Sequence, residues 1–398
     1  MPKLQSKSLP LIVDQVDLAR IVQEVRDSGI FALDLEFVTE GFYSPKLALV
    51  QIAWGQMTEP QIALIDPLQV DVTELVALVA NANICTVIHA SQADLQILGD
   101  QFGVRAKNFI DTQIAAAFAG FQDQVGYGNL VEQITGVLLN KASQFSDWVR
   151  RPLSEKQLLY AANDVEYLLE CWNHLESKLR QTGRLEYVLL ECDSFAELWS
   201  SRPPVDLSYL KVDKAKSLRP NEMGVLRNLA AWRETKAREN NVPRIRILSD
   251  RTLIEISREM PETIEEMAPI RGLTSGQIRN FGDTLIEEIA LGRADPIKPA
   301  DKRGTRKINS TSLSSVLNAI IQKEAKTAGI ASRFIATRSE IDELVHWFLS
   351  STAVSEEPDL RILQSWRREL VGNSVLEWLS GKKTIIAARD SEVGFRLS

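Results

Sequence analysis

The sequence predicts an α/β domain with a mixed β-sheet, followed by two domains built only of helices. The first half alternates short apolar, β-prone runs with amphipathic stretches of helical period. Two consecutive prolines, Pro203 and Pro204, then follow small and polar residues, where they would end a helix and stiffen a linker. Beyond Leu218 we find only helical periodicity. A chain of 398 residues is too long for one ordinary domain.

The expected elements follow from these periods. In a first domain over residues 1–200, strands are expected at 31–37, 47–54, 62–65 and 85–89, and helices near 14–27, 71–80, 91–101, 111–119, 127–136 and 154–180. A helical domain is expected over 211–295, where Pro243 breaks one amphipathic helix and Ser249 caps the next. A third domain, also helical, is expected over 310–385.

The charged residues are unevenly distributed along the chain. Residues 1–200 carry 14 Lys and Arg against 26 Asp and Glu, a formal charge of −12, whereas residues 211–251 carry 11 against 5, a formal +6. A basic segment is typical of a nucleic-acid-binding surface, although such cations can also simply solvate the outer faces of helices.

The cysteines and the apolar runs exclude several classes of protein. Cys85, Cys171 and Cys192 are odd in number and have no Cys-x-x-Cys spacing, so they indicate neither a disulfide framework nor a zinc site. No stretch reaches the ~18 uninterrupted apolar residues of a membrane span, and the N-terminus lacks the pattern of a signal peptide. We therefore expect a cytoplasmic protein without a membrane partner, and a monomer.

Four acidic residues and one tyrosine stand out within the first domain. Asp34 and Glu36 lie two positions apart on an expected strand, so their side chains should share one face. Tyr160 and Asp164 lie four apart on an expected helix and should also share a face. Asp94 lies near the start of another expected helix. Taken one at a time, the acids could simply be solvated side chains at the ends of strands and helices, and Tyr160 could be an ordinary buried aromatic. Because all five residues occur in one expected α/β domain, a common site is favoured.

Such a site has a specific chemistry. Mg²⁺ and similar hard ions prefer oxygen ligands, so converging carboxylates suit them better than His or Cys. Two ions about 3.5–4 Å apart stabilise the attacking and leaving oxygens when a phosphodiester is hydrolysed. The phenol of Tyr160 would position the attacking water.

These segments resemble the ribonuclease D group of 3′-to-5′ exonucleases. The resemblance rests on Leu33 to Phe37, Tyr43 to Ile52, His89 to Leu95, Asp111-Thr112-Gln113, Lys141, Asp147-Trp148, Arg151-Pro152-Leu153, and Tyr160 to Val165. It implies a ribonuclease H-like, mixed-sheet exonuclease domain. Asp34, Glu36, Asp94 and Asp164 would be the ligands of two divalent ions, Mg or Mn, and Tyr160 would hold the nucleophilic water.

The later segments resemble the helical HRDC domains that follow the nuclease domain in this group. The first match comprises Leu226, Leu229, Trp232-Arg233, Ala237, Val242-Pro243, Ile247, Asp250, Leu253, Ile256 and Ile270 to Leu273; the second comprises Ile330 to Arg338 and Ser365 to Gly372. An auxiliary nucleic-acid surface is implied. Trp366-Arg367-Arg368 is interpreted as a core aromatic beside surface cations, with RNA contact as the alternative. The cationic segment 297–307 is expected to be a mobile linker that can touch phosphate.

The resemblance implies an exoribonuclease that releases nucleoside 5′-monophosphates from RNA with a free 3′ end, with transfer RNA precursors as the implied substrate. Substrate contacts are expected from Phe37 and Ile97, which would flank a base, and from Lys141, which would offset charge in the transition state. His89 would contact the nucleotide or, as the alternative, be a structural residue at the end of a strand. Residues 147–153 are interpreted as a brace for the loop that carries Lys141.

Two rival functions remain open on the sequence alone. One is a DNA exonuclease of repair or proofreading type, because the same metal site cleaves either polymer. The other is a non-catalytic RNA-binding scaffold. The presence of all five expected residues argues against the scaffold.

Overall fold

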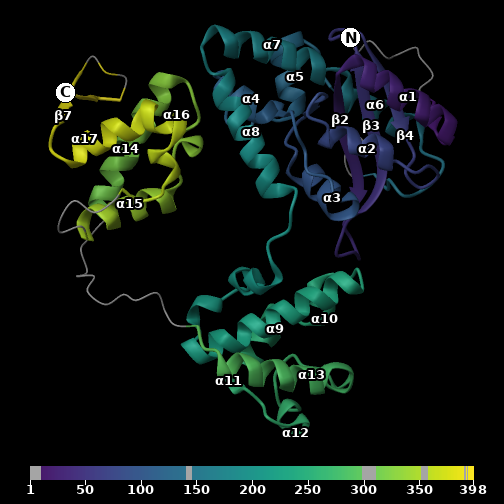
Figure 1. The fold of residues 1–398 in the computed structure, drawn as a ribbon, viewed down its shortest axis with the longest axis vertical. Helices are drawn as coiled ribbons and strands as arrows, with labels where there is room; N and C mark the ends of the chain where they lie inside the picture. Colours follow the sequence, from purple (N-terminus) through teal and green to yellow (C-terminus); the bar gives the residue numbers. More distant parts are fainter. Residues whose placement is uncertain (1–9, 140–145, 298–310, 351–356, 390, 392) are drawn as a thin grey trace.

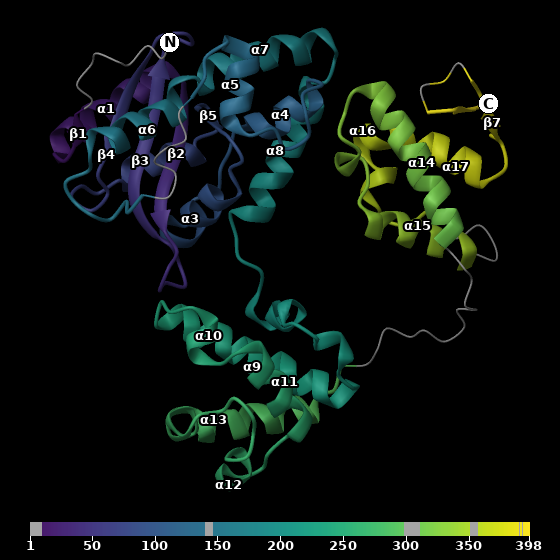
Figure 2. The ribbon, with the colours of Figure 1, turned by 180° about the vertical axis from the view of Figure 1, so that it is seen from behind.

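The computed structural model describes residues 10–139, 146–297, 311–350, 357–389, 391 and 393–398. They form an α/β domain and two helical bundles (Figure 1). The first bundle lies below the α/β domain in this view, and the second lies beside helix α8 (Leu185–Trp199). The view from behind shows the same arrangement (Figure 2).

The sheet of the α/β domain is mixed, as the sequence predicts. Its strands run in the order β1-β4-β3-β2-β5-β6. The central pairs β2 with β3 and β3 with β4 are antiparallel, whereas β1 with β4, β2 with β5 and β5 with β6 are parallel. The bounds are β1 Leu11–Ile12, β2 Ile30–Val38, β3 Lys46–Gly55, β4 Pro60–Ile65, β5 Cys85–Ile88 and β6 Phe109–Asp111.

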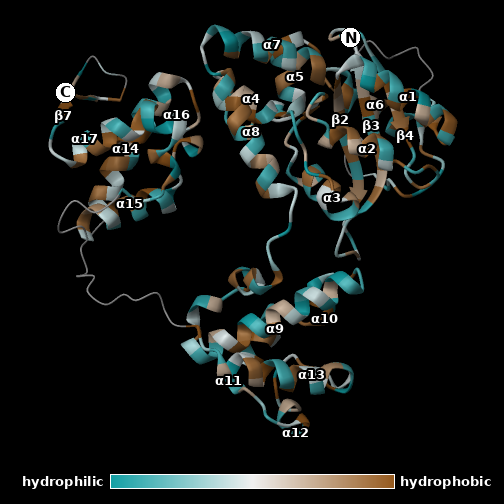
Figure 3. Cartoon of the chain, in the orientation of Figure 1, coloured by the Kyte–Doolittle hydropathy of each residue, from teal (hydrophilic) through white to brown (hydrophobic). Residues whose placement is uncertain are grey.

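Helices cover both faces of the sheet, which explains why β3 is buried from Leu47 to Trp54. Apolar colouring accordingly runs along the central strands, and polar residues lie on the outer turns of the helices (Figure 3). The helices are α1 Gln15–Ser28, α2 Thr73–Ala77 with a short 3₁₀ turn Leu78–Ala80, α3 Gln92–Phe102, α4 Thr112–Phe118, α5 Tyr127–Thr135, α6 Glu155–Glu166, α7 Leu168–Gln181 and α8.

Three features of this domain differ from the sequence-based expectation. Strands β1 and β6 were not predicted because two and three residues are too few to show a period. The helix expected over 154–180 is two helices, which meet at Tyr167, a residue that is 1% exposed. Helix α8 was not predicted.

The first bundle contains α9 Pro220–Glu239, α10 Arg244–Ile247, α11 Asp250–Glu259, α12 Ile264–Met267 and α13 Ser275–Ala294, preceded by 3₁₀ turns at Val205–Lys211 and Ala215–Ser217. Helices α9 and α13 pack closely because Gly224 and Gly292 face each other: a Cβ on Gly292 would lie 2.6 Å from the carbonyl oxygen of Gly224. Ser249 caps α11 through the N–H of Thr252, as predicted.

The second bundle contains α14 Thr311–Ala328, α15 Arg338–Ser350, α16 Ser365–Arg367, a π-helical turn Arg368–Gly372 and α17 Asn373–Leu379, with 3₁₀ turns at Ser332–Phe334 and Arg361–Leu363. A hairpin of β7 Ile385–Ala387 and β8 Phe395–Leu397 follows, so the expectation of helices alone after Leu218 is wrong at this end.

The second bundle packs against α8 of the α/β domain. The ring of Trp366 stacks on that of Tyr187 with centroids 5.0 Å apart, and Phe334 lies 4.9 Å from Phe118. Arg367 is buried and pairs with Glu191, which also accepts a hydrogen bond from Trp366 Nε1 at 3.3 Å. Trp366 and Arg367 are therefore buried in a domain interface. Their position agrees with the interpretation of Trp366 as a core aromatic and not with direct RNA contact.

Two further expectations concern membranes and the linker. None of the helices in the described ranges is long and apolar enough to cross a membrane. The expected linker over 297–307 lies outside the described residues, except for Ile297.

Candidate active site

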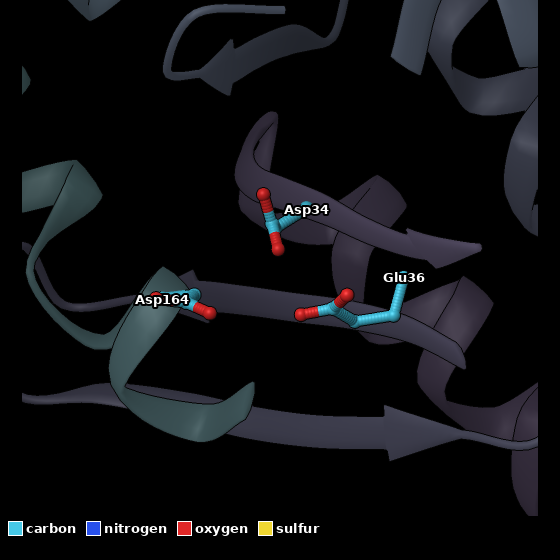
Figure 4. Close-up of side chains that lie close together, drawn as sticks. All are labelled: Asp34, Glu36 and Asp164. Atoms are coloured by element: carbon cyan, nitrogen blue, oxygen red, sulfur yellow. The ribbon is translucent and has the colours of Figure 1, made fainter. Parts of the chain in front are cut away.

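Strand β2 brings two carboxylates to one face of the sheet. Asp34 and Glu36 alternate with Leu33 and Leu35, which are buried on the opposite face. The register places Asp34 opposite Gln51 of β3 and is interrupted after Glu36 by a bulge between Glu36 and Phe37. Figure 4 shows the two carboxylates projecting from β2 toward the same space.

Helix α6 adds Asp164 and Tyr160 from the side. The side chain of Ser154 caps α6, and Ala161 and Ala162 pack on the sheet with no exposed surface. Because these residues are small, α6 lies close to β2 and β3. Carboxylate oxygens of Asp34, Glu36 and Asp164 lie within 4.8 Å of one another.

Asp94 lies in the first turn of α3. Asp94 is 6% exposed, and the negative charges of Asp34 and Glu36 raise its pKa. It does not belong to the group of Asp34, Glu36 and Asp164, whose carboxylate oxygens lie within 4.8 Å of one another. The predicted four-acid set is thus a tight group of three with a fourth, nearby carboxylate.

Burial raises the pKa of all four carboxyl groups, and the charge of Asp34 adds to this effect at the other three. Burial raises the pKa of Asp34 to about 7, and burial followed by the charge of Asp34 raises the pKa of Glu36 to about 8. Burial and then Asp34 also raise the pKa values of Asp94 and Asp164 well above the usual range. Among the described residues, the neighbouring charges that raise these pKa values are all negative.

This donor set fits divalent cations. Oxygen ligands with several like charges suit hard ions such as Mg²⁺ and Mn²⁺, and carboxylates that repel one another would gain stability from a bound cation. The side chain of Gln51 lies beside Asp34 on the same face, is fully buried, and has no hydrogen-bond partner at either amide atom among the described residues. The sequence interpretation gave Gln51 no role at the site.

The phenol of Tyr160 lies near enough to the carboxyl group of Asp164 for each group to shift the pKa of the other. Burial, followed by the charge of Asp164, raises the pKa of the phenol above its usual range. The hydroxyl therefore stays protonated at neutral pH, which suits a group that holds water by hydrogen bonds rather than one that acts as a phenolate.

The expected substrate residues occupy different surroundings. Phe37 and Ile97 both line a cavity of about 980 Å³ between the α/β domain and the first bundle, although Ile97 is only 1% exposed. His89 Nδ1 lies 2.9 Å from Thr112 Oγ1, its ring lies 5.6 Å from that of Tyr127, and burial lowers its pKa. Lys141 lies outside the described residues. A role in substrate binding stays a prediction for all four.

Residues 147–153 connect the sheet with the start of α6. Arg151 pairs with Asp66 at 2.7 Å and donates to the carbonyl of Ala48 at 2.8 Å. Trp148 is buried and lies 6.0 Å from the ring of Tyr160. These contacts hold the segment against the sheet and α6, whereas the loop that carries Lys141 lies outside the described residues, so the expected bracing of that loop stays a prediction.

One further cluster was not predicted, because it joins residues about 200 positions apart. Tyr43, in the loop after β2, donates a hydrogen bond to Glu234 of α9, and its ring lies 4.1 Å from the guanidinium of Arg202 and 5.1 Å from that of Arg244. Burial would raise the pKa of Glu234, but hydrogen bonds from Arg244 and Tyr43 lower it to about 2. Arg202 also pairs with Asp100 of α3. The cluster links the first bundle to the loop after β2 and to α3.

Comparison with known proteins gives matches along most of the chain. A 3′-5′ exonuclease family model matches residues 11–180, an HRDC domain model matches 222–289, and a model of the ribonuclease D C-terminal HRDC domain matches 312–375. Two curated proteins named ribonuclease D are similar to this chain. That of Gluconacetobacter diazotrophicus is 35% identical over 378 residues, and the match covers 94% of this chain and 93% of the relative. That of Sphingobium indicum is 32% identical over 381 residues, and the match covers 94% of this chain and 95% of the relative.

The crystal structure of Escherichia coli ribonuclease D, described as an exoribonuclease involved in structured RNA processing, superposes with a TM-score of 0.81. It is 29% identical, and the match covers 94% of this chain and 99% of that one.

Proposed function

This chain belongs to the ribonuclease D family of 3′-to-5′ exonucleases, and we propose that Asp34, Glu36, Asp94 and Asp164, with Tyr160, are its catalytic residues. It is an exoribonuclease, a phosphodiester hydrolase. The observation that carries the residue assignment is the convergence of carboxylate oxygens of Asp34, Glu36 and Asp164 within 4.8 Å, with Tyr160 one turn before Asp164 on α6. Asp94 completes the set from α3.

The reaction is hydrolysis of the last phosphodiester of an RNA chain. The four carboxylates would hold two divalent cations, which would supply positive charge at the scissile phosphate and activate water. The Tyr160 hydroxyl, one turn before Asp164 on α6, orients the attacking water toward phosphorus. The bond to the 3′ oxygen of the preceding nucleotide breaks, and a nucleoside 5′-monophosphate leaves.

The 3′ end enters along the cavity between the α/β domain and the first bundle. Phe37 directly follows the proposed ligand Glu36, Ile97 lies one turn after Asp94, and both residues line this cavity. Phe37 flanks the terminal base. Lys141 and His89 remain candidates for contacts to the phosphate and the nucleotide.

The first bundle contributes cations that other described residues do not neutralise. Arg202, Arg233 and Arg244 line the cavity, but they pair with Asp100, Asp250 and Glu234. Within residues 205–251, the exposed cations that make no ion pair with another described residue are Lys211, Lys214, Lys216, Arg246 and Arg251. These are the candidates for phosphates upstream of the cleaved bond.

The substrates are RNAs with free 3′ ends, and 3′-extended transfer RNA precursors are the proposed class. Support comes from the family membership and from the similarity to an enzyme described as processing structured RNA. Mg²⁺ and Mn²⁺ are both suitable, because each accepts carboxylate ligands.

A paired digestion tests the function. RNA and DNA oligonucleotides of one sequence are incubated with the full chain and either Mg²⁺ or Mn²⁺, and the Asp164→Asn variant serves as the control. We expect mononucleotides from RNA, little from DNA, and almost none with the variant. Faster digestion of DNA would favour the DNA exonuclease, and no digestion with either metal would favour a binding scaffold.

A further inference from the structure

Asp111, at the end of β6, is a buried carboxylate that the reaction itself does not use. It is 1% exposed. Oδ1 accepts from the N–H groups of Ala90 at 3.0 Å and Gln113 at 2.8 Å; Oδ2 accepts from the N–H of Ser91 at 2.9 Å and from its hydroxyl at 2.8 Å. None of these donors is charged.

Only one of these four bonds serves the helix that Asp111 caps. The bond from Gln113 closes the first turn of α4, and the other three hold Ala90 and Ser91, about 20 positions earlier in the chain. Holding α4 alone would need a single oxygen. Most of the carboxylate's bonding capacity is therefore directed at the turn between β5 and α3.

That turn has an unusual backbone. Ala90 has a φ of 53°, in the left-handed region that residues with a Cβ rarely adopt. Ser91 is the N-cap of α3, but its side chain makes no capping hydrogen bond to that helix; its hydroxyl donates to Asp111. The two consecutive N–H groups of the turn point at the two oxygens of one carboxylate.

The turn decides where Asp94 lies. Asp94 is three residues after Ser91, in the first turn of α3, and it is the one proposed ligand outside the tight group of three. Its distance from Asp34 and Glu36 therefore depends on how α3 begins. His89, just before the turn, is fixed to the same β6–α4 corner through Thr112, whose hydroxyl also donates to the carbonyl of Ile88 at 3.1 Å.

We propose that Asp111 is a positioning residue that holds the β5–α3 turn so that Asp94 reaches the metal site. The inference rests on the proposed role of Asp94 as a ligand. It makes Asp111 part of the support of the site, although it touches neither substrate nor metal.

The variant Asp111→Asn separates the two tasks of this carboxylate. The amide keeps an oxygen that can accept from Ala90 and Gln113, so α4 keeps its cap, because Asn is as good an N-cap as Asp. The amide nitrogen, however, replaces the acceptor of the Ser91 N–H by a donor. Asp14→Asn is the matched control, since Asp14 caps α1 with one oxygen only, at 2.8 Å and 3.3 Å from two N–H groups.

Mn²⁺ binding to the full chain, measured by calorimetry without RNA, is the test. We expect Asp111→Asn to weaken Mn²⁺ binding by about 10-fold or more, the usual effect of losing the support of a ligand, and Asp14→Asn to bind as the parent does. RNA hydrolysis by Asp111→Asn should recover in part at high Mn²⁺. Unchanged Mn²⁺ affinity in a folded Asp111→Asn protein would overturn the proposal.

Two further variants make the outcome decisive. Ser91→Ala removes one bond to Asp111 and should weaken Mn²⁺ binding less than Asp111→Asn; if Asp111→Asn does not fold, an unchanged affinity of Ser91→Ala overturns the proposal. Asp94→Asn should weaken binding directly. If Asp94→Asn binds Mn²⁺ as the parent does, the ligand assignment itself fails; if it loses Mn²⁺ while Asp111→Asn keeps it, only the positioning role fails.

Discussion

Metal binding at this site should depend steeply on pH. Burial raises the pKa of Asp34 to about 7, and burial with the charge of Asp34 raises that of Glu36 to about 8. At pH 6, about one tenth of Asp34 and about one hundredth of Glu36 would be ionised; at pH 8, about nine tenths of Asp34 and about one half of Glu36 would be. The ionised fraction therefore rises about 10-fold for Asp34 and about 50-fold for Glu36. Because the two carboxyl groups are not independent, we expect Mn²⁺ affinity to rise by at least about 50-fold between pH 6 and pH 8.

The sign of the stability effect follows from the same values. For an acid whose pKa is higher in the folded protein, the contribution to stability is present below the unfolded value and is lost as the pH rises through the folded value. Without metal, the Asp34 and Glu36 contributions are therefore present below their ordinary pKa values of 3.8 and 4.5 and are lost as the pH rises through about 7 and 8. Added Mn²⁺ should raise the melting temperature more at pH 8 than at pH 6.

Calorimetry in two buffers of different ionisation enthalpy measures both the affinity and the protons released. We expect proton release on binding at pH 6 and less at pH 8. Asp34→Asn should lower the number of protons released as well as the affinity. Equal affinity at the two pH values, with no proton release, would refute the conclusion that burial keeps these carboxyl groups protonated.

Three other predictions concern catalysis, domain docking and RNA capture. Tyr160→Phe should slow single-turnover hydrolysis by about 100-fold while leaving RNA binding intact; an unchanged rate would exclude its role in holding water. Glu191→Ala leaves the buried guanidinium of Arg367 unpaired, so unfolding by urea should show a loss of about 3 kcal/mol, and unchanged stability would contradict the docked interface. Replacing Arg246 and Arg251 by Ala should weaken RNA binding equally for all RNA sequences. The slope of log affinity against log salt concentration should become shallower by about one unit for each phosphate that the variant no longer binds. An unaltered slope would show that neither arginine binds phosphate.

The sequence predicts those parts of the fold that have a clear period. Strand β2, with its alternation around Asp34 and Glu36, and the helical spacing of Tyr160 and Asp164 were sufficient to predict two segments of the site. Strand β6 was not predicted, because its three residues are too few for a pattern. Asp111 ends that strand, so its position beside the β5–α3 turn was not evident either.

Contacts between residues far apart in the chain could not be predicted from local sequence patterns either. Tyr43 and Glu234 are 191 residues apart, and Trp366 and Glu191 are 175 apart, yet both pairs join domains. The sequence Trp366-Arg367 does not tell whether these two side chains are exposed or buried. The packing of Trp366 on Tyr187 and the pairing of Arg367 with Glu191 distinguish an interface from a surface that could bind RNA.

The central claim is that carboxylates on β2, α3 and α6 hydrolyse RNA from its 3′ end. The most direct test digests one 5′-labelled RNA with Mg²⁺ in three forms, having a free 3′ hydroxyl, a blocked 3′ end, or a closed circle, using the parent chain and Asp34→Asn. The account predicts stepwise shortening and nucleoside 5′-monophosphates from the free end alone, and almost no product with Asp34→Asn. Cleavage of the circle, or an Asp34→Asn protein that works at the parent rate, would contradict it.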